Sequence, residues 1–326
     1  MNHTILQMLR DAQPSVFQKV ASYTLPEDIP HGDMPGDKIL IENAHIAKAQ
    51  KLMAPLVDNL ITTLECKQSE RCVISVCGGS GVGKSETASL LAWYLGQLGL
   101  PCYVLSGDNY PYRIPVHNDA ERMRIFRDNG IKGLFAHGVY TPEIGETLHT
   151  LMLQDQDAAP SLCEQYPWLA LYQSTGRNAL KGYLGTSNEI DFTRVTDIIV
   201  QFQNGAKAIM LKRMGREEAH LWYDLVDFSN ISVLIIEWTH SNSDFLSGVD
   251  IPILLNSTPQ ETLAHRRQRN RDGKIDSPFT TMVLEIEQAL LTVQAHKAKI
   301  IMSKDGQLLT YPEFCRIMKL KRGEME

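Results

Sequence analysis

An eight-residue glycine-rich run, Gly-Gly-Ser-Gly-Val-Gly-Lys-Ser at positions 78–85, constrains the fold of this chain more than any other feature. It directly follows the short apolar run VISVC at 73–77. Glycines let the backbone wrap so that successive N–H groups point inward at phosphate oxygens, and a helix that follows adds its positive N-terminal dipole. In this GxxxxGK(S/T) spacing the lysine reaches the β- and γ-phosphates, and the last hydroxyl ligates Mg²⁺. The run therefore predicts a nucleotide-phosphate site between a buried strand and a helix.

The expected ligands of this site are ATP and Mg²⁺. Lys84 is predicted to bind the phosphates and to take part in catalysis, and Ser85 is predicted to bind the metal. The full predicted nucleotide-binding set is Gly78, Gly79, Ser80, Gly81, Val82, Gly83, Lys84, Ser85 and Glu86.

The segments around the glycine-rich run alternate between strand and helix patterns. A helix is expected over 86–98 and a second strand over 102–105. A strand, a helix and a strand within about 35 residues form a βαβ unit, so the sheet should be parallel. Further apolar runs of strand length lie at 233–237, 251–255 and 299–302. We therefore predict an α/β fold, a P-loop three-layer sandwich with a parallel sheet.

Helical patterns fill most of the remaining chain. They cover residues 41–65, 191–202, 206–214, 258–271 and 281–297. The segment at about 115–190 is predicted to be a mainly helical insertion on the substrate side of the site. We expect residues 1–69 to form an N-terminal helical extension that caps the core, and residues 70–326 to form the P-loop domain.

Composition narrows the class of protein. The formal net charge is −6 with both signs mixed along the chain, which argues against a nucleic-acid binder. The six cysteines include no CxxC pair, as expected of reduced thiols in a cytoplasmic protein. No stretch approaches the roughly 18 apolar residues of a membrane span. A small-molecule substrate is therefore expected, with no membrane partner, and a homo-oligomer stays open.

Two acidic residues end predicted strands on the edge that should carry the glycine-rich loop. Asp108 follows the strand at 102–105, and Glu237 ends the strand at 233–237. The carboxyl ends of parallel strands form the ligand-facing edge of such a sheet. Asp108 can accept a proton from a substrate hydroxyl or organise the magnesium shell, and Glu237 can serve Mg²⁺. His240, three residues after Glu237, either contacts substrate or satisfies local hydrogen bonds.

A basic cluster, HRRQRNR at 265–271, stands out in this acidic protein. Transfer of a phosphoryl group spreads negative charge over its oxygens, and guanidinium groups on a closing lid can neutralise that charge. Arg267 and Arg271 share one helical face and are the predicted catalytic lid residues.

These motifs together resemble the phosphoribulokinase/uridine kinase family of P-loop small-molecule kinases. The resemblance rests on 78–85, SGDNY at 106–110, IIE at 235–237 and RRQRNRD at 266–272, and it covers about 70–113 and 186–305. It implies that Asp108 acts as the base, that Glu237 lies on the substrate side and that the arginines form a lid. NEIDF at 188–192 resembles the family's acidic segment, which implies that Asp191 contacts the acceptor. The long insertion and the residues Trp-Thr-His at 238–240 depart from the family pattern.

Three functions stay open at this point. The first is a kinase that moves the γ-phosphoryl group of ATP to a hydroxyl of a small metabolite. The second is adenylylsulfate kinase, which has a strand-end motif similar to 106–109. The third is a nucleotide switch or ATPase whose insertion binds a protein partner. Asp108 and the arginine cluster favour the kinases, because a switch positions water and needs no acceptor base.

The acceptor is less defined than the donor. The region after Asp108 is aromatic and basic, with Tyr110 and Arg113 as predicted substrate contacts beside Asp191, Glu237 and His240. Such a region suits a sugar acid, a sugar phosphate or a nucleoside stacked on tyrosine.

Overall fold

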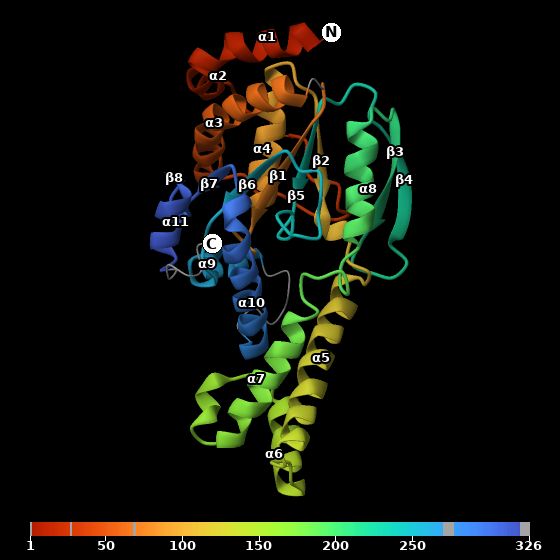
Figure 1. Ribbon diagram of the computed structural model, residues 1–326, viewed down its shortest axis with the longest axis vertical. Helices are drawn as coiled ribbons and strands as arrows, with labels where there is room; N and C mark the ends of the chain where they lie inside the picture. The colour runs from red at the N-terminus through yellow and green to blue at the C-terminus, as the bar shows by residue number, and fades with distance from the viewer. Residues whose placement is uncertain (1, 27, 68–69, 270–276, 320–326) are drawn as a thin grey trace.

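The computed structural model describes residues 2–26, 28–67, 70–269 and 277–319 (Figure 1). Its central sheet has the strand order β2-β5-β1-β6-β7-β8. The strands in that order are Cys102–Ser106, Val233–Glu237, Cys72–Gly78, Ile251–Leu255, Ile300–Met302 and Leu308–Leu309. All neighbours are parallel except β7 and β8. The predicted α/β fold and the five strands expected from the sequence are confirmed.

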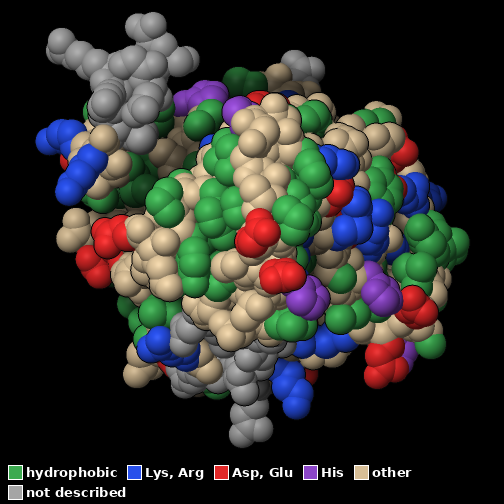
Figure 2. Space-filling view, turned by 90° about the horizontal axis from the view of Figure 1, so that it is seen from below, with side chains coloured by type: hydrophobic (Ala, Val, Ile, Leu, Met, Phe, Trp, Pro, Cys, Tyr) green, Lys and Arg blue, Asp and Glu red, His purple; other side chains and the backbone are tan. Residues whose placement is uncertain are grey.

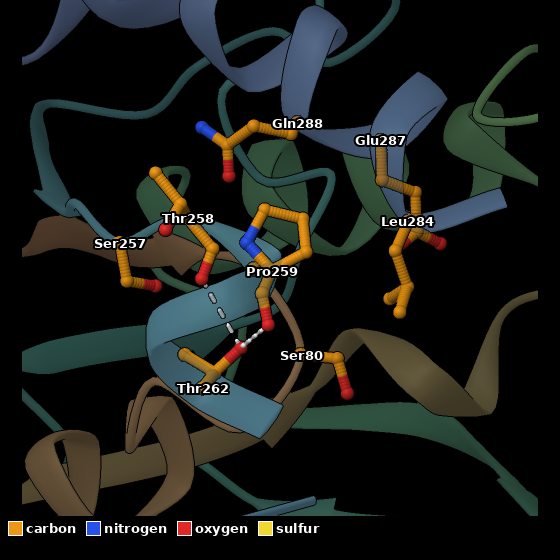
Figure 3. Close-up of a pocket in the computed structure, with 9 residues that line it drawn as sticks. Ser80, Ser257, Thr258, Pro259, Thr262, Leu284, Glu287 and Gln288 are labelled. Atoms are coloured by element: carbon orange, nitrogen blue, oxygen red, sulfur yellow. Dashed lines mark hydrogen bonds between the residues drawn. The ribbon is translucent and has the colours of Figure 1, made fainter. Parts of the chain in front are cut away.

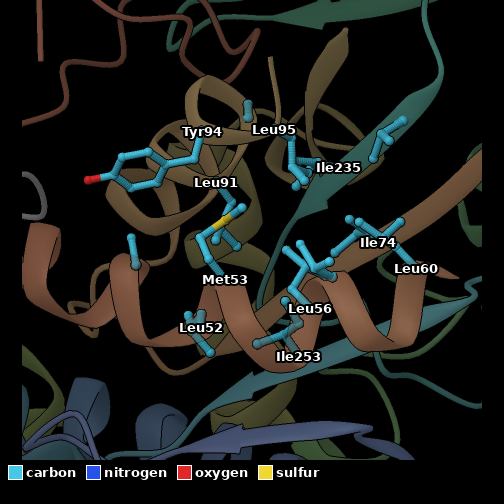
Figure 4. Close-up of a cluster of buried hydrophobic side chains, with 14 of the residues drawn as sticks. Leu52, Met53, Leu56, Leu60, Ile74, Leu91, Tyr94, Leu95, Ile235 and Ile253 are labelled. Carbon is cyan, nitrogen blue, oxygen red and sulfur yellow. The ribbon is translucent and has the colours of Figure 1, made fainter. Parts of the chain in front are cut away.

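Helices α3 (Asn43–Lys67) and α4 (Lys84–Gln97) cover one face of this sheet. Alternate residues of β1, Ile74 and Val76 among them, point into the hydrophobic cluster beneath these helices. Leu52, Leu56 and Leu60 lie four residues apart on α3 and enter the same cluster (Figure 4). The glycine-rich loop is therefore anchored between a fully buried strand and a helix with one side in the core.

The other face of the sheet is covered by several elements. These are α8 (Phe192–Gln203), the hairpin of β3 (Ala208–Met214) and β4 (Leu221–Asp227), α10 (Pro278–Gln294) and α11 (Tyr311–Ile317). The helix predicted over 206–214 is wrong, because this segment pairs antiparallel with β4. Ile209 and Leu211 are buried at alternate positions, which is the spacing of a half-buried strand. The strand at β4 had not been predicted.

The predicted helical insertion forms a lobe that extends from the carboxyl edge of the sheet (Figure 1). It consists of α5 (Pro115–Ala136), α6 (Pro142–Leu153) and α7 (Pro167–Lys181). Helices α5 and α7 approach each other closely at Gly176. A Cβ at this position would lie 2.5 Å from the Phe126 carbonyl oxygen. Phe279 and Ile286 of α10 join the core of this lobe and connect it to the sheet layer.

The N-terminal helices α1 (Asn2–Ala12) and α2 (Val16–Ser22) pack onto α3. Their residues Leu9, Val16 and Val20 belong to the same hydrophobic cluster as β1. The chain then runs without regular structure to α3, as expected from its prolines and glycines. Short 3₁₀ turns η1 (Gln13–Ser15), η2 (Gly107–Asn109), η3 (Pro160–Cys163) and η4 (Ala295–Lys297), with helix α9 (Pro259–Arg269), complete the described elements.

Two further results concern the described residues as a whole. None of the helices in these ranges has the length and apolar character needed to cross a membrane. All six cysteines are free thiols.

Candidate active site

The glycine-rich loop joins β1 to α4 at the carboxyl edge of the sheet. A Cβ on Gly78 would lie 2.6 Å from the Leu255 carbonyl oxygen, so only glycine lets β1 and β6 approach this closely here. Gly83, immediately before α4, has φ 95, a left-handed conformation that favours glycine. The Lys84 ammonium donates to the Gly79 carbonyl oxygen at 3.1 Å. The lysine therefore places its charge across the loop.

Glu237 ends β5, which lies between β1 and β2 in the sheet. Its carboxylate accepts hydrogen bonds from the Ser85 hydroxyl at 3.1 Å and from the Ser106 hydroxyl at 2.6 Å. The side chain is almost completely buried. Burial, followed by the negative charge of Asp108, raises the pKa of Glu237 to about 8. A buried carboxylate is thus joined to the predicted metal residue Ser85.

Asp108 lies in η2, the turn that follows β2, and its side chain is exposed. It lines a cavity of about 500 Å³ that also reaches Ser80 of the glycine-rich loop. The other residues around this cavity are Met34, Asp37, Pro111, Arg113, Pro115, Val116, Asn118, Asp119, Arg122, Met214 and Arg216. The predicted base and the predicted phosphate loop therefore share one cavity large enough for a small molecule.

Ser80 of the glycine-rich loop also lines two further cavities. A cavity of about 300 Å³ is lined by Ser80, Asp119 and Arg122 together with residues of α10. A small pocket of about 10 Å³ lies between Ser80 and the start of α9, where Thr262 donates to the carbonyl oxygens of Thr258 and Pro259 (Figure 3). Ser80 thus lies where all three spaces converge.

Arg122 of α5 is the cation common to the two larger cavities; it belongs to the basic region that follows Asp108 in the sequence but is not among the predicted site residues. Its Nε donates to Glu189 at 2.6 Å, and its other nitrogens lie 3.3 Å from Asp119 and 4.0 Å from Glu287. Although burial lowers the pKa of Arg122, these carboxylates raise it well above the usual range. Burial in turn raises the pKa of Glu287. Arg122 is therefore a fixed, permanently charged group beside the glycine-rich loop.

Glu189 holds this arrangement together from the end of the insertion. It also accepts hydrogen bonds from the Gly185 N–H at 2.6 Å and the Asn118 side chain at 2.8 Å. The Tyr112 N–H donates to the Glu189 carbonyl oxygen at 3.0 Å, and Pro111 forms an isolated antiparallel bridge with Ile190, so the segment after Asp108 pairs with the segment before α8. The acidic segment predicted at 188–192 is thus brought beside the turn of Asp108.

The predicted substrate residues fall into different environments. Arg113 lines the 500 Å³ cavity and donates to the Tyr183 hydroxyl at 2.9 Å. Tyr110 is fully buried in the hydrophobic cluster with Phe192 and Trp238. It is not one of the residues that line the 500 Å³ cavity. Asp191 accepts from the Arg194 N–H at 2.9 Å and begins α8 as its N-cap.

His240 is buried, with its ring 5.6 Å from that of Trp238. Burial lowers the pKa of His240 to about 4, with Glu189 opposing that shift. His240 does not belong to the linings of the three cavities around Ser80. The substrate contact predicted for His240 stays a prediction.

The predicted lid is described only in part. Arg267 lies on α9 with an exposed side chain. Arg271 lies outside the described residues. Glu86, expected among the nucleotide-binding residues, is fully buried in the first turn of α4.

The residues of the site fit one magnesium ion bound mainly through phosphates. Mg²⁺ is commonly held by one or two protein oxygens, with waters and substrate phosphates as the remaining ligands. Ser85 and Glu237 supply such a pair at the foot of the glycine-rich loop. Across the described ranges there is no cluster of three His, Cys, Asp or Glu that could hold a metal by itself. A metal that arrives with the nucleotide matches this donor set.

The surface around the helical lobe carries charges of both signs. Seen from the lobe end, Lys and Arg side chains are interspersed with Asp and Glu (Figure 2). The charge on this face is mixed, like that of the sequence.

Known proteins similar to this chain include a sugar kinase. Over 238 residues the chain is 40% identical to the bifunctional alpha-galactosidase/sucrose kinase AgaSK of Mediterraneibacter gnavus. The match covers 73% of this chain and 20% of that protein, so the chain spans one fifth of the length of this curated relative. No protein-family model matches the chain.

Two solved structures are similar over most of their length. One is a proposed fructose transport system kinase from Silicibacter sp. TM1040, with TM-score 0.44, 16% identity, and coverage of 75% of this chain and 94% of that chain. The other is a possible uridine kinase from Bacillus stearothermophilus, with TM-score 0.37, 14% identity, and coverage of 76% and 98% respectively. The name of the curated relative agrees with the predicted resemblance to small-molecule kinases and does not indicate adenylylsulfate kinase.

Proposed function

We propose that this chain is an ATP-dependent kinase that transfers the γ-phosphoryl group to a hydroxyl of an uncharged sugar. The observation that carries the proposal is the cavity shared by Asp108 and Ser80. It brings a carboxylate able to act as a base to the same space as a residue of the phosphate-binding loop. A nucleotide switch would require no such acceptor cavity beside its phosphates.

The mechanism follows from the positions of these groups. Lys84 and the backbone N–H groups of the loop bind the phosphates of the donor. Ser85 and Glu237 would hold Mg²⁺, which neutralises charge on the phosphate oxygens when bound. Asp108 orients the acceptor hydroxyl and takes its proton as the new oxygen–phosphorus bond forms. Arg122, already fixed by carboxylates, lies where it can offset negative charge on the transferring group.

The charge of the 500 Å³ cavity supports an uncharged acceptor. Its lining contains three carboxylates, Asp37, Asp108 and Asp119, and three guanidinium groups, Arg113, Arg122 and Arg216. An anionic sugar acid or sugar phosphate would be favoured by an excess of basic groups, and among the described lining residues the two signs balance. Polar groups of both signs suit the hydroxyls of a neutral sugar, each of which both donates and accepts hydrogen bonds.

Other features of the cavity weigh against a nucleoside acceptor. Among the described residues that line the cavity there is no aromatic side chain on which a base could stack, and Tyr110 is buried in the hydrophobic cluster with Phe192 and Trp238. The curated relative is a bifunctional alpha-galactosidase/sucrose kinase, and sucrose is a neutral disaccharide. Sucrose and its component sugars are therefore the first acceptors to examine.

We also propose that residues 70–326 form the P-loop kinase domain, to which the N-terminal segment adds Met34 and Asp37 at the acceptor cavity, with the lobe at about 115–190 as its substrate-side insertion. Its first helix supplies Asn118, Asp119 and Arg122 to the acceptor cavity. A cytoplasmic location is proposed with the activity, since ATP is the donor. Arg267 is retained as a proposed lid residue on the exposed side of α9.

The test measures ADP formation from Mg²⁺·ATP with a panel of acceptors and identifies the phosphorylated product by mass spectrometry. The panel contains sucrose, fructose, glucose, fructose 6-phosphate, gluconate, uridine and adenylylsulfate. We expect turnover and a phosphorylated product with a neutral sugar. Turnover that is the same with and without every acceptor would instead support the switch, and a product from adenylylsulfate alone would support that kinase.

A further inference from the structure

Part of the N-terminal segment between α2 and α3 reaches the acceptor cavity. A Cβ on Gly32 would lie 3.1 Å from Oε1 of Glu237. Met34 and Asp37 line the 500 Å³ cavity beside Asp108. The sequence pattern predicts that residues 1–69 form a helical cap on the core and marks no site residue among them. The structure instead brings residues 32–37 to the edge of the sheet that carries the site.

Asp33 is the most constrained residue of this segment. One carboxylate oxygen accepts from the Ser106 N–H at 2.8 Å and from the Asn109 side-chain amide at 3.0 Å. The other accepts from the Tyr103 hydroxyl and the Arg213 guanidinium, both at 2.8 Å. The side chains of Asp33 and Arg213 are each only 9% exposed. All four of these partners donate a hydrogen bond to the carboxylate. A carboxylate can accept at both oxygens, whereas the NH₂ group of an amide cannot accept.

The two turn contacts of Asp33 lie on either side of Asp108. Ser106 is the last residue of β2, and Asn109 is the last residue of η2. The Asn109 side chain also accepts from the Met214 N–H at 2.9 Å, which ties the turn to β3. Asp108 itself is exposed, so its position toward the cavity depends on how its neighbours are held. Asp33 holds both neighbours at once.

We propose that Asp33 is a positioning residue for the acceptor base, and that residues 32–37 are a built-in part of the acceptor site. The inference rests on the proposed kinase function, because it assigns Asp33 a role through Asp108. The buried ion pair with Arg213 holds one carboxylate oxygen of Asp33. The hydrogen bonds from Ser106 and Asn109 to the other oxygen hold the turn that carries Asp108. Arg213 is itself held on its other side by Asp224 at 3.1 Å.

The test compares Asp33→Asn with Asp28→Asn, which changes an exposed residue of the same segment. For each variant, kcat and KM for the sugar are measured beside ATP affinity and the slow hydrolysis of ATP without acceptor. We expect Asp33→Asn to lower kcat for the sugar by about 10²-fold, since a displacement of about 1 Å has that effect. ATP affinity and hydrolysis without acceptor should stay within about twofold of the original protein, and Asp28→Asn should change nothing.

Asn109→Ala supplies a second variant that leaves the Asp33–Arg213 pair intact. If Asp33→Asn does not fold, a selective loss of kcat in Asn109→Ala still supports the proposal, and an unchanged kcat overturns it. An equal loss of ATP affinity, hydrolysis and sugar phosphorylation in a folded Asp33→Asn protein would also overturn it, because that pattern indicates general damage. If the original protein itself phosphorylates no sugar, the proposed kinase function fails. That result differs from failure of the Asp33 proposal, in which the original protein is active and Asp33→Asn is not selectively impaired.

Discussion

The hydroxyl of Ser85 donates a hydrogen bond to Oε2 of Glu237 across 3.1 Å, which joins the start of α4 to the end of β5. The two residues lie 152 positions apart in the chain. They meet because β5 is inserted between β1 and β2, so that its last residue lies beside the glycine-rich loop. The contact links a predicted magnesium ligand to a buried carboxylate whose pKa is raised to about 8 by burial and then by Asp108.

Magnesium-dependent ATP binding should therefore strengthen as pH rises toward 8. Below that value the Glu237 carboxyl holds a proton in the free protein, and it must release this proton before it can serve the metal. Affinity should increase at most about tenfold per pH unit between pH 6.5 and 8, then level off. Calorimetric titration at several pH values measures this change, with proton release read from buffers of different ionisation enthalpy.

Glu237→Gln provides the control for that titration, because it retains size and removes the ionisation. Its ATP affinity should be weaker and nearly independent of pH over the same range. Asp108→Asn should move the rise to lower pH, since the charge of Asp108 contributes to the raised pKa of Glu237. A flat profile in the original protein would contradict the assignment.

Asp108→Asn should reduce turnover far more than ATP binding. The amide keeps the shape of the side chain but cannot take the proton of the acceptor hydroxyl, and general-base catalysis contributes about 10²–10⁴-fold. Steady-state kinetics with the sugar and a separate measurement of ATP affinity check this. Equal losses in turnover and in ATP affinity would show that Asp108 does not act as the base.

Lys84→Ala should weaken ATP binding and turnover together. The ammonium lies across the glycine-rich loop at 3.1 Å from the Gly79 carbonyl oxygen, so its removal takes positive charge from the phosphate site. The control is Lys132→Ala, which removes one lysine from the exposed surface of the helical lobe and leaves the glycine-rich loop unchanged. Normal activity in Lys84→Ala, or an equal effect in Lys132→Ala, would refute this site.

His240 should make the fold sensitive to acid. Burial lowers its pKa to about 4, whereas an unfolded histidine titrates near 6.5. Between these values the unfolded state binds the additional proton, so the free energy of unfolding should be constant above pH 6.5 and fall as pH drops toward 4. The loss attributable to this group is about 3 kcal/mol at most.

Denaturant unfolding of His240→Gln at several pH values tests this expectation. The variant should lose less stability than the original protein between pH 6.5 and 4, whatever its stability at neutral pH. His296→Gln, at an exposed position, should retain the original pH dependence. The same acid sensitivity in His240→Gln would rule out His240 as the source.

Gly78→Ala should destabilise the protein even without nucleotide. The added Cβ would lie 2.6 Å from the Leu255 carbonyl oxygen, and a backbone atom cannot move aside cheaply. We expect a cost of about 1–3 kcal/mol from this overpacking. Gly79→Ala is the matched control, because no heavy atom lies within 3.8 Å of its added Cβ. Thermal unfolding of both variants should separate them, and equal melting temperatures would contradict the explanation.

The sheet and the phosphate half of the site could be predicted because their signals are local. The glycine-rich run fixes a strand before it and a helix after it, and five apolar runs are short enough to be strands. Once the sheet is parallel, Asp108 and Glu237 must lie on the same edge as Lys84. That inference needs no knowledge of side-chain packing.

The acceptor half could not be predicted in the same way. Asp33 and Arg213 are 180 positions apart, and neither carries a spacing pattern that marks it as a partner of the other. The segment 206–214 is short and apolar, and only its pairing with β4 decides between helix and strand. Tyr110 follows Asp108 by two residues, yet it is turned into the core, which depends on Phe192 and Trp238 from distant segments.

The first two turns of α5 have a consequence for protein engineering. Pro115, Asn118, Asp119 and Arg122 lie at helical spacing and together supply one wall of the acceptor cavity. A library confined to Pro115, Asn118 and Asp119 would vary acceptor preference within a single element, while Ser85 at the start of α4 and Glu237 at the end of β5 stay untouched. Arg122 should be kept in such a library, because its carboxylate partners would otherwise lose their counter-charge. Recognition of the acceptor can thus be redesigned separately from the use of ATP.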